Sequence, residues 1–355
     1  PILSTGYKVT CCYGGHDMQI EKNNLLQAPA VLIGTPGRII DHIHRRHINT
    51  SGIKTLILDE YDKCLEFGFT DVIFDIVKVM PKLCRRVLTS ATPAVQIHDF
   101  IGLTNPEKLN YLTNEAPENL KVKIVKTSVD NRLDTLFRLV SKIGNQPTLI
   151  FCNQRDTVDQ ISNLLWEKSL PNNVFHGGLD QTLRERTLIK FRNGSHSVLV
   201  TTDLASRGLD IPEIEHVIHF NLPENEKVFT HRNGRTARMH AAGTSYLLVN
   251  EKETIPVYLK EKPKYETLPE KAVIPAVSNW VTLYISAGKK EKISKMDIAG
   301  LFMQKGKLKK DEVGLIDVLD HVSYVAVKRD KVDQVLLAVK NTPIKKRKVL
   351  VEIAR

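Results

Sequence analysis

The sequence has 355 residues, which is too long for one ordinary hydrophobic core, and we expect three domains. Its formal net charge of +11 favours a polyanionic partner such as a nucleic acid. The five cysteines form no Cys-x-x-Cys pair and no apolar run approaches the ~20 residues that span a bilayer, so the sequence indicates neither a zinc or disulfide framework nor a membrane protein.

Short apolar runs rich in β-branched residues recur through the first 220 residues, each followed by a turn and a helical pattern. Continuous apolar runs of this length are typical of parallel strands buried on both faces, so we predict an α/β fold here. The predicted strands are 30–33, 55–58, 86–89, 148–151, 197–200 and 216–219.

Changes in composition divide the chain. A polar stretch near 105–120 separates a first domain, 1–118, from a second, 119–250, and a proline-containing connector follows at 251–279. Residues 280–355 are predicted to form a small βαββαβ domain of the kind found in many RNA-binding modules. Its predicted elements are strand 280–285, helix 296–304, strands 313–319 and 322–327, helix 330–340 and strand 347–353.

Two adjacent carboxylates, Asp59 and Glu60, directly follow the predicted strand 55–58. In nucleotide hydrolases such a pair holds magnesium, often through water, and orients the water that attacks the γ-phosphate. Asp59 is therefore the candidate metal-side carboxylate and Glu60 the candidate base. An isolated Asp-Glu pair is more often a solvated surface charge, so this interpretation depends on the other motifs.

Arg235 and Arg238 lie three residues apart and would project from one face of a helical turn, where they could neutralise charge on a transferred phosphoryl group. A pair of surface arginines is the alternative. The sequence contains no Gly-x-x-x-x-Gly-Lys-Ser/Thr phosphate loop, although the acidic pair normally works beside one. We therefore expect the chain to be an N-terminally truncated nucleotide hydrolase.

Ser90 and Thr92 follow the predicted strand 86–89 and offer two hydroxyl groups at its end. They could relay hydrogen bonds between Asp62 and His231, and the alternative is that they cap a helix. Each candidate residue in this part of the chain follows a predicted strand, which is where ligands bind in parallel α/β folds.

Eight ordered segments resemble the motifs of the DEAD-box RNA helicases across roughly residues 1–250. The segments are Gly14-Gly15, Thr35-Pro36-Gly37-Arg38, Asp59-Glu60-Tyr61-Asp62, Ser90-Ala91-Thr92, Phe151-Cys152-Asn153, His176-Gly177-Gly178, Thr201-Thr202-Asp203-Leu204-Ala205-Ser206-Arg207-Gly208-Leu209-Asp210 and His231-Arg232-Asn233-Gly234-Arg235-Thr236-Ala237-Arg238. The resemblance implies two RecA-like domains that close on ATP, with Mg²⁺, and on single-stranded RNA.

The resemblance also implies roles for individual residues. Asp210 would approach the ATP ribose, and Arg235 and Arg238 would reach its γ-phosphate. RNA phosphates and riboses would be contacted, without reading base edges, by Gly14, Gly15, Thr35, Gly37, Arg38, Gln181, Arg184, Thr202 and Arg207. The implied activity is ATP-dependent RNA duplex unwinding by a monomer.

The C-terminal part resembles the RNA-binding domain of the bacterial DEAD-box protein A group, most closely over 280–293. From residue 281 onward there are 17 lysines and arginines against 9 aspartates and glutamates. That group binds large-subunit ribosomal RNA and acts in ribosome assembly, which implies a bacterial cytoplasmic protein. Candidate RNA contacts are Lys289, Lys290, Lys292, Lys345, Lys346, Arg347 and Lys348, with Tyr324 as a base-stacking candidate or a core residue.

Three departures from the family pattern bear on activity. The first is Tyr61, which replaces an alanine, and the second is a pair of milder changes, Asn233 for a commonly aliphatic residue and Ala237 for a glycine. The third departure is the missing phosphate loop and its neighbouring motifs, so we expect the 355 residues alone to be inactive as an ATPase and to expose unpaired strand edges. The rival hypotheses are a non-catalytic ribosomal-RNA scaffold derived from a helicase and, less favoured, a DNA helicase.

Overall fold

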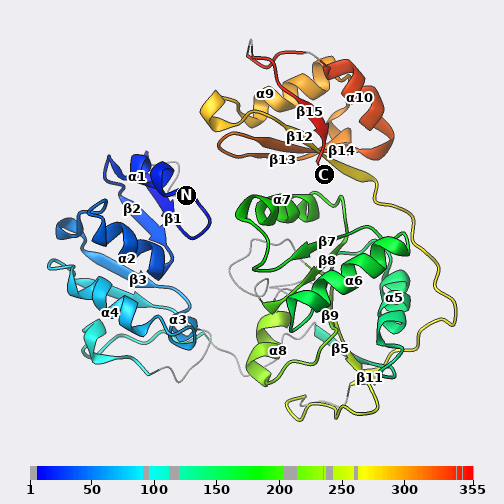
Figure 1. The fold of residues 1–355 in the computed structure, drawn as a ribbon, viewed down its shortest axis with the longest axis horizontal. Helices are drawn as coiled ribbons and strands as arrows, with labels where there is room; N and C mark the ends of the chain where they lie inside the picture. The colour runs from blue at the N-terminus through cyan, green and yellow to red at the C-terminus, as the bar shows by residue number, and fades with distance from the viewer. Residues whose placement is uncertain are drawn as a thin grey trace. The chain divides into compact units, whose positions relative to one another are not determined.

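The structure is a computed structural model that describes residues 6–90, 96–111, 120–203, 214–234, 236, 243–259, 263–340, 342–345 and 347–354. The chain forms two compact units, residues 1–115 and residues 116–355 (Figure 1), which are described separately below. Among these described residues, no helix combines the length and apolar character needed to cross a membrane.

The first unit contains two pairs of parallel strands, β1 with β2 and β3 with β4. The predicted strands 30–33, 55–58 and 86–89 are confirmed to within one residue. The strands are β1 (Val9–Cys12), β2 (Val31–Gly34), β3 (Thr55–Leu58) and β4 (Arg85–Leu88). The helices are α1 (Met18–Leu25), α2 (Pro36–His44), α3 (Tyr61–Glu66) and α4 (Thr70–Lys78).

The two strand pairs remain separate within the described residues, since β2 pairs with β1 alone and β3 with β4 alone. Apolar side chains on these strands are consequently open to solvent: Ile33 on β2 is 54 % exposed and Ile57 on β3 is 63 % exposed. Both features agree with the sequence-based expectation that this domain exposes strand edges and apolar surface.

The second unit contains a seven-stranded parallel sheet in the order β11-β5-β10-β9-β6-β8-β7. Every residue of β6 and β8 is buried, as predicted for strands covered on both faces. The strands are β5 (Leu120–Lys126), β6 (Thr148–Phe151), β7 (Asn172–Phe175), β8 (Val198–Thr201), β9 (His216–His219), β10 (Gly243–Val249) and β11 (Lys264–Tyr265). Three of them confirm the predictions at 148–151, 197–200 and 216–219.

Four helices of the second unit alternate with these strands (Figure 1). Leu136 of α5 and Ile161 of α6 pack against Ile150 and Val200 of the sheet in one large core, and all four side chains are fully buried. The helices are α5 (Arg132–Ile143), α6 (Arg155–Glu167), α7 (Gln181–Arg192) and α8 (Glu226–Asn233). Together with the first unit, this sheet confirms the predicted pair of RecA-like parallel-sheet domains.

The C-terminal module, residues 280–354, has a four-stranded antiparallel sheet in the order β13-β14-β12-β15. Its core is separate from that of the parallel sheet and includes Leu283, Ile298, Val325 and Val335. The elements are β12 (Trp280–Ile285), α9 (Lys295–Gly300) continued by a π-helical turn (Leu301–Lys305), β13 (Val313–Val318), β14 (Ser323–Lys328), α10 (Val332–Val339) and β15 (Val351–Ile353). This βαββαβ order is the one predicted from the sequence.

The connector packs against the seven-stranded sheet rather than forming a free extended link. Its strand β11 pairs in parallel with β5 at the edge of the seven-stranded sheet. Glu266, which follows β11, forms an ion pair with Lys123 of β5 at 2.5 Å and another with Lys142 of α5. Partial burial favours the neutral form of the Glu266 carboxyl, but the hydrogen bonds from the two lysines outweigh it and lower the pKa of this group.

Candidate nucleotide and RNA site

The acidic pair lies at the carboxyl end of β3, where Thr89, the residue directly after the neighbouring strand β4, holds it. The Thr89 hydroxyl donates to Asp59 Oδ1 and accepts from the Glu60 N–H at 3.1 Å. The Thr89 carbonyl accepts from the Tyr61 N–H at 2.9 Å. Glu60 has φ 49° and ψ 49°, the left-handed conformation, which is strained for a residue with a side chain. Such strain clusters at functional sites.

Tyr61 starts α3 and is buried, with 1 % of the residue exposed. Its ring packs with Ile73 of α4 and Ile101 in a small core, and its hydroxyl accepts the backbone N–H of His98 at 3.4 Å. Burial raises the pKa of this hydroxyl. The ring is thus part of the hydrophobic core of the first unit and does not turn to solvent.

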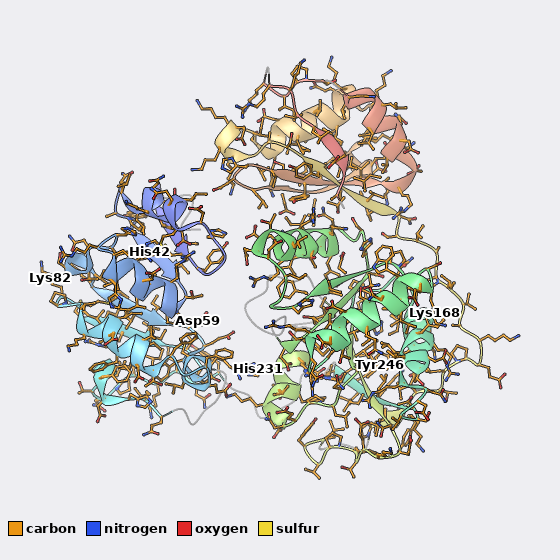
Figure 2. The ribbon with its side chains drawn as sticks, in the orientation of Figure 1. His42, Asp59, Lys82, Lys168, His231 and Tyr246 are labelled. Atoms are coloured by element: carbon orange, nitrogen blue, oxygen red, sulfur yellow. The ribbon has the colours of Figure 1, made fainter. Side chains whose placement is uncertain are left out.

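The remaining predicted catalytic residues are placed as follows. Asp62 is buried on α3, Ser90 is exposed beyond the end of β4, and His231 lies on α8 of the second unit (Figure 2 labels Asp59 and His231). The predicted relay between Asp62 and His231 would join two units and stays a prediction. Four candidates lie outside the described residues: Thr92, Asp210, Arg235 and Arg238.

The predicted RNA-contacting glycines of the first unit lie in exposed backbone after two neighbouring parallel strands. Gly14 and Gly15 form the turn after β1, and Gly15 has φ +91°, which favours glycine. Thr35 and Gly37 lie at the start of α2, directly after β2. A Cβ added to Gly14 or Gly37 would meet no atom within 4 Å, so a ligand can approach both backbones closely.

Arg38 turns into the protein instead of outward. Its guanidinium donates to the Tyr13 carbonyl at 3.3 Å and to the His16 carbonyl, and it forms an ion pair with Glu21 at 3.0 Å. Only 15 % of the Arg38 side chain is exposed. The structure therefore gives Arg38 a bracing position behind the Gly14-Gly15 turn, and its predicted phosphate contact stays a prediction.

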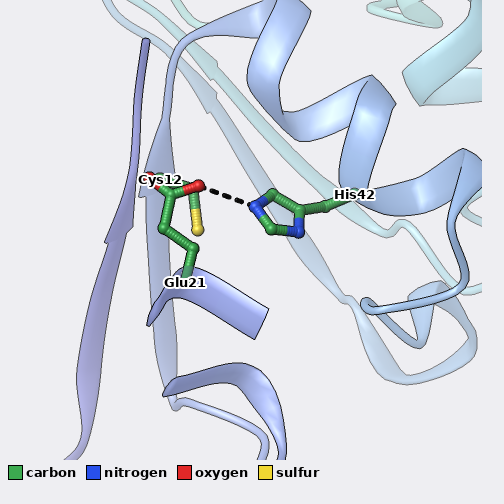
Figure 3. Close-up of side chains that lie close together, drawn as sticks. All are labelled: Cys12, Glu21 and His42. Carbon is green, nitrogen blue, oxygen red and sulfur yellow. Dashed lines mark hydrogen bonds and ion pairs between the residues drawn. The ribbon is translucent and has the colours of Figure 1, made fainter. Parts of the chain in front are cut away.

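A buried group of three side chains lies beside this brace: Cys12 of β1, Glu21 of α1 and His42 of α2 (Figure 3). Their donor atoms lie within 4.8 Å of one another, and His42 Nε2 is 2.7 Å from Glu21 Oε2. Cysteine, histidine and glutamate are typical zinc ligands. However, burial and then the Glu21 charge raise the pKa of the Cys12 thiol to about 11, and Arg38 already pairs with the same Glu21 oxygen. A cation there would meet a guanidinium.

In the second unit, Arg232 ties together three of the motif segments. It is fully buried on α8 and forms a two-pronged ion pair with Asp203, at 2.6 and 2.9 Å. It also donates to Asn153 Oδ1 and to the Asn221 carbonyl, both at 2.9 Å. Because Asp203 and Asn153 follow β8 and β6, this one side chain holds the carboxyl ends of two strands against α8.

Further predicted RNA contacts lie near the start of α7. His176, after β7, is bonded to Asp159 of α6 at 3.2 Å and accepts the Gly178 N–H at 3.1 Å, which fixes the glycine turn. Gln181 and Arg184 lie in the first turn and a half of α7 and are partly exposed. Thr202 follows β8 and is partly exposed, and Arg207 lies outside the described residues.

Two basic segments of the C-terminal module, predicted separately, lie side by side. The Lys345 ammonium donates to the Lys292 carbonyl at 2.8 Å and pairs with Asp297 at 2.7 Å. Arg347 lies 3.6 Å from Glu291. Lys345 and Arg347 are thus partly neutralised by internal acids. The exposed members of this basic patch, as named from here on, are Lys289, Lys290, Lys292, Lys345, Arg347 and Lys348, and Lys346 lies outside the described residues.

Tyr324 lies on β14 and is 2 % exposed. It packs with Ile189 of α7 and with Ala354, so the face of the small sheet that carries it contacts the second RecA-like domain. Nearby, Arg192 of α7 pairs with Asp317 of β13 at 3.0 Å. A ring buried in this way has no face open to a base, which corrects the predicted stacking role and favours the core alternative.

Comparison with known proteins agrees with this arrangement. Family models match residues 2–100 (DEAD/DEAH box helicase), 131–240 (helicase conserved C-terminal domain) and 282–353 (DbpA RNA binding domain). The chain belongs to the DEAD-box RNA helicases. The three matched regions also follow the order of the first unit, the seven-stranded sheet and the C-terminal module.

Among similar DEAD-box proteins is the ATP-dependent RNA helicase DbpA of Escherichia coli, 31 % identical over 91 % of this chain and 72 % of that protein. DbpA of Bacillus subtilis is 27 % identical over 98 % of this chain and 79 % of its own length. A solved structure of Saccharomyces cerevisiae Dbp5 bound to RNA and ADP BeF3 aligns with a TM-score of 0.60 and 25 % identity, over 70 % of this chain and 65 % of that one. This chain therefore spans just under two thirds of that neighbour.

The structure gives roles to three residues of this DEAD-box chain that had none in the sequence-based prediction. Thr89 anchors the acidic pair, Glu21 lies behind the Gly14-Gly15 turn, and Arg232 joins the strand ends of the second domain. Arg232 and Asp203 had a signal in the sequence, since both lie inside recognised motifs. Glu21 had no such signal in the sequence, because a glutamate in a short polar helix is typical of a solvent-exposed charge.

Proposed function

We propose that this protein acts as an ATP-dependent RNA helicase that remodels large-subunit ribosomal RNA during ribosome assembly in the bacterial cytoplasm, as a monomer. The observation that carries the proposal is Glu60, held in a left-handed conformation beside Asp59 at a strand end. A left-handed conformation at a non-glycine residue costs of order 1–3 kcal/mol and is retained mainly at functional sites. Enzymes of phosphoryl transfer use carboxylates to hold magnesium and to orient the nucleophile.

Asp59 and Glu60 fit the magnesium side of a magnesium–ATP complex. Asp59 is exposed at the end of β3, and the hydrogen bond from Thr89 to Oδ1 orients its carboxylate so that Oδ2 can accept from a metal-bound water. When bound, Mg²⁺ would neutralise charge on the β- and γ-phosphates. Glu60 would accept the proton of the attacking water, and the backbone conformation fixes its direction. Arg235 and Arg238 remain proposed cations for the same phosphate.

RNA binding has its own support. The Gly14-Gly15 turn and the start of α2 present open backbone after neighbouring strands, and the basic patch of the C-terminal module offers exposed lysines. Contacts of this kind address phosphates and would give sequence-independent grip in the helicase domains. The DbpA-type module would then select the ribosomal RNA.

The 355 residues contain no phosphate-loop motif, so we propose that this chain alone binds RNA without turning over ATP. The test compares RNA-stimulated ATP hydrolysis by the 355-residue chain and by the same chain carrying an N-terminal phosphate-loop segment. We expect hydrolysis only in the extended chain, and its loss in the extended Glu60→Gln variant. RNA binding without hydrolysis in the extended chain would favour the scaffold alternative.

A further inference from the structure

The carboxylate of Glu21 lies between the two segments of the first unit that are proposed to contact RNA. Glu21 is 1 % exposed, and its Oε1 accepts the Tyr13 N–H, directly before Gly14, at 3.1 Å. Its Oε2 forms an ion pair with Arg38 Nε at 3.0 Å and a hydrogen bond with His42 Nε2 at 2.7 Å, and both partners lie on α2. One side chain on α1 is therefore bonded to the glycine turn and to the helix that begins after Thr35.

Arg38 completes this connection. Its guanidinium donates to the carbonyls of Tyr13 and His16, which flank the Gly14-Gly15 turn on both sides. A glycine pair has few conformational restraints of its own, so the turn takes its shape from these bonds. A carboxylate and a guanidinium that are removed from water together are hard to separate, because each would leave the other buried and unpaired.

We propose that Glu21 is a positioning residue for RNA binding. Through Arg38 and His42 it fixes the Gly14-Gly15 turn relative to the start of α2, so that backbone N–H groups of both segments meet the same stretch of phosphates. This inference rests on the proposed function. It also assigns Arg38 to the support of the site rather than to the RNA.

The test measures hydrogen exchange in the full 355-residue chain with and without a 20-nucleotide polyuridine strand. The readout is the peptide that covers residues 12–17, compared among the wild type, Glu21→Gln and the control Asp41→Asn. Asp41 is an exposed acid on α2 that pairs with Arg45, so the control removes one carboxylate charge from the same region.

We expect RNA to slow exchange in this peptide about tenfold in the wild type and in Asp41→Asn, and less than twofold in Glu21→Gln. Equal protection in Glu21→Gln and the wild type would overturn the positioning role while leaving the proposed function intact. No protection in the wild type would instead remove the proposed RNA contact at this turn, and the inference with it.

A double-mutant cycle keeps the inference testable if Glu21→Gln loosens the whole first unit, which faster exchange in β3 and β4 would reveal. RNA affinity is measured for Glu21→Gln, Arg38→Gln and the double variant. We expect the double variant to bind RNA no more weakly than the single variant with the lower RNA affinity, because Glu21 and Arg38 act through one network. Additive losses would mean that Arg38 contacts RNA itself. One equivalent of bound zinc in the wild type that is lost in Glu21→Gln would also overturn the inference, in favour of a metal site.

Discussion

The guanidinium of Arg232 and the carboxylate of Asp203 meet in parallel, with Nε–Oδ1 at 2.6 Å and Nη2–Oδ2 at 2.9 Å. The arginine is 1 % exposed, whereas the side chain of Asp203 is 37 % exposed. Bidentate pairs of this kind fix geometry as well as adding energy. Here the pair joins the end of β8 to α8, two segments that both belong to family motifs.

Replacing Arg232 with methionine should therefore destabilise the second unit. The variant loses the ion pair and two hydrogen bonds to Asn153 and Asn221, and we expect a loss of about 3 kcal/mol. Urea unfolding followed by circular dichroism measures it. The control is Arg138→Met, which removes a partly exposed pair with Asp134 on α5 and should cost less than about 1 kcal/mol. Equal urea midpoints for Arg232→Met and Arg138→Met would contradict a stabilising role of the Arg232 network.

The buried His219 should make the second unit sensitive to acid. Burial, and then the nearby Arg232 charge, lower the pKa of His219 to about 3 from the ordinary value of 6.5, while Asn233 and Ser245 bond its Nε2. Between pH 6.5 and 3 the His219 side chain is protonated in the unfolded chain but not in the folded chain. The contribution of this group to the free energy of unfolding is therefore fully present above about pH 6.5 and is lost as the pH drops towards 3.

The slope from this one group is about 1.4 kcal/mol per pH unit between these limits. His196 adds to it, because its burial lowers its pKa to about 4. Urea midpoints at pH 7.5, 6 and 5 measure the slope, which should be shallower in His219→Gln. A His321→Gln control, at a histidine that is 64 % exposed, should keep the wild-type slope. A wild-type slope in His219→Gln would show that this histidine titrates normally.

Tyr61 should tolerate loss of its hydroxyl better than loss of its ring. Tyr61→Ala leaves a cavity beside Ile73 and Ile101 and should cost about 3 kcal/mol. Tyr61→Phe only leaves the His98 N–H without its acceptor and should cost about 1 kcal/mol. Thermal unfolding of the two variants tests the order, and equal losses would show that packing of the ring contributes little.

Gly288 should be irreplaceable in the C-terminal module. A Cβ at this position would lie 2.3 Å from the Leu319 carbonyl oxygen and 2.7 Å from that of Asp320, both backbone atoms that cannot move aside cheaply. We expect Gly288→Ala to cost more than about 2 kcal/mol. Gly300→Ala, in α9 with nothing within 4 Å, should be neutral or stabilising. Thermal unfolding compares them, and similar melting temperatures would contradict the close contact.

The basic patch should contribute through charge alone. Replacing Lys289 and Lys290 with alanine should weaken RNA binding by the 355-residue chain and reduce the slope of log affinity against log salt by about 2. The control is Lys309→Ala with Lys310→Ala, two exposed lysines of the same module outside the patch. Fluorescence anisotropy at several salt concentrations provides both numbers. An unchanged slope in the patch variant would remove these lysines from the RNA contact.

Local patterns were enough to predict most of the fold. The run Thr148-Leu149-Ile150-Phe151 is apolar at every position, and the structure buries every residue of it. The βαββαβ order of the C-terminal module was equally visible. The course of the connector could not be predicted, because its prolines and charges are typical of an extended link. The pairing of β11 with β5 depends on a partner strand more than 130 residues away in the sequence.

The candidate site likewise contains residues that the sequence could predict and residues whose orientation it could not. Asp59, Glu60 and the glycines could be found because their spacing after strands is a local property of the chain. The inward turn of Arg38 and the burial of Tyr324 could not, because each depends on a partner from another element: Glu21 of α1 in one case and Ile189 of α7 in the other. Spacing predicts which residues lie at a site, whereas packing decides which of them face the ligand.

The course of the connector bears on how this protein can be dissected. Leu268 and Ala272 pack against the main core of the second unit, and Tyr265 pairs with the buried Ile124 of β5. A fragment that stops at 250, the boundary which the composition suggests, would lose these contacts and leave the edge of β5 uncovered. Any isolated second domain should therefore be cut beyond residue 272, so that it keeps the strand and the two apolar anchors.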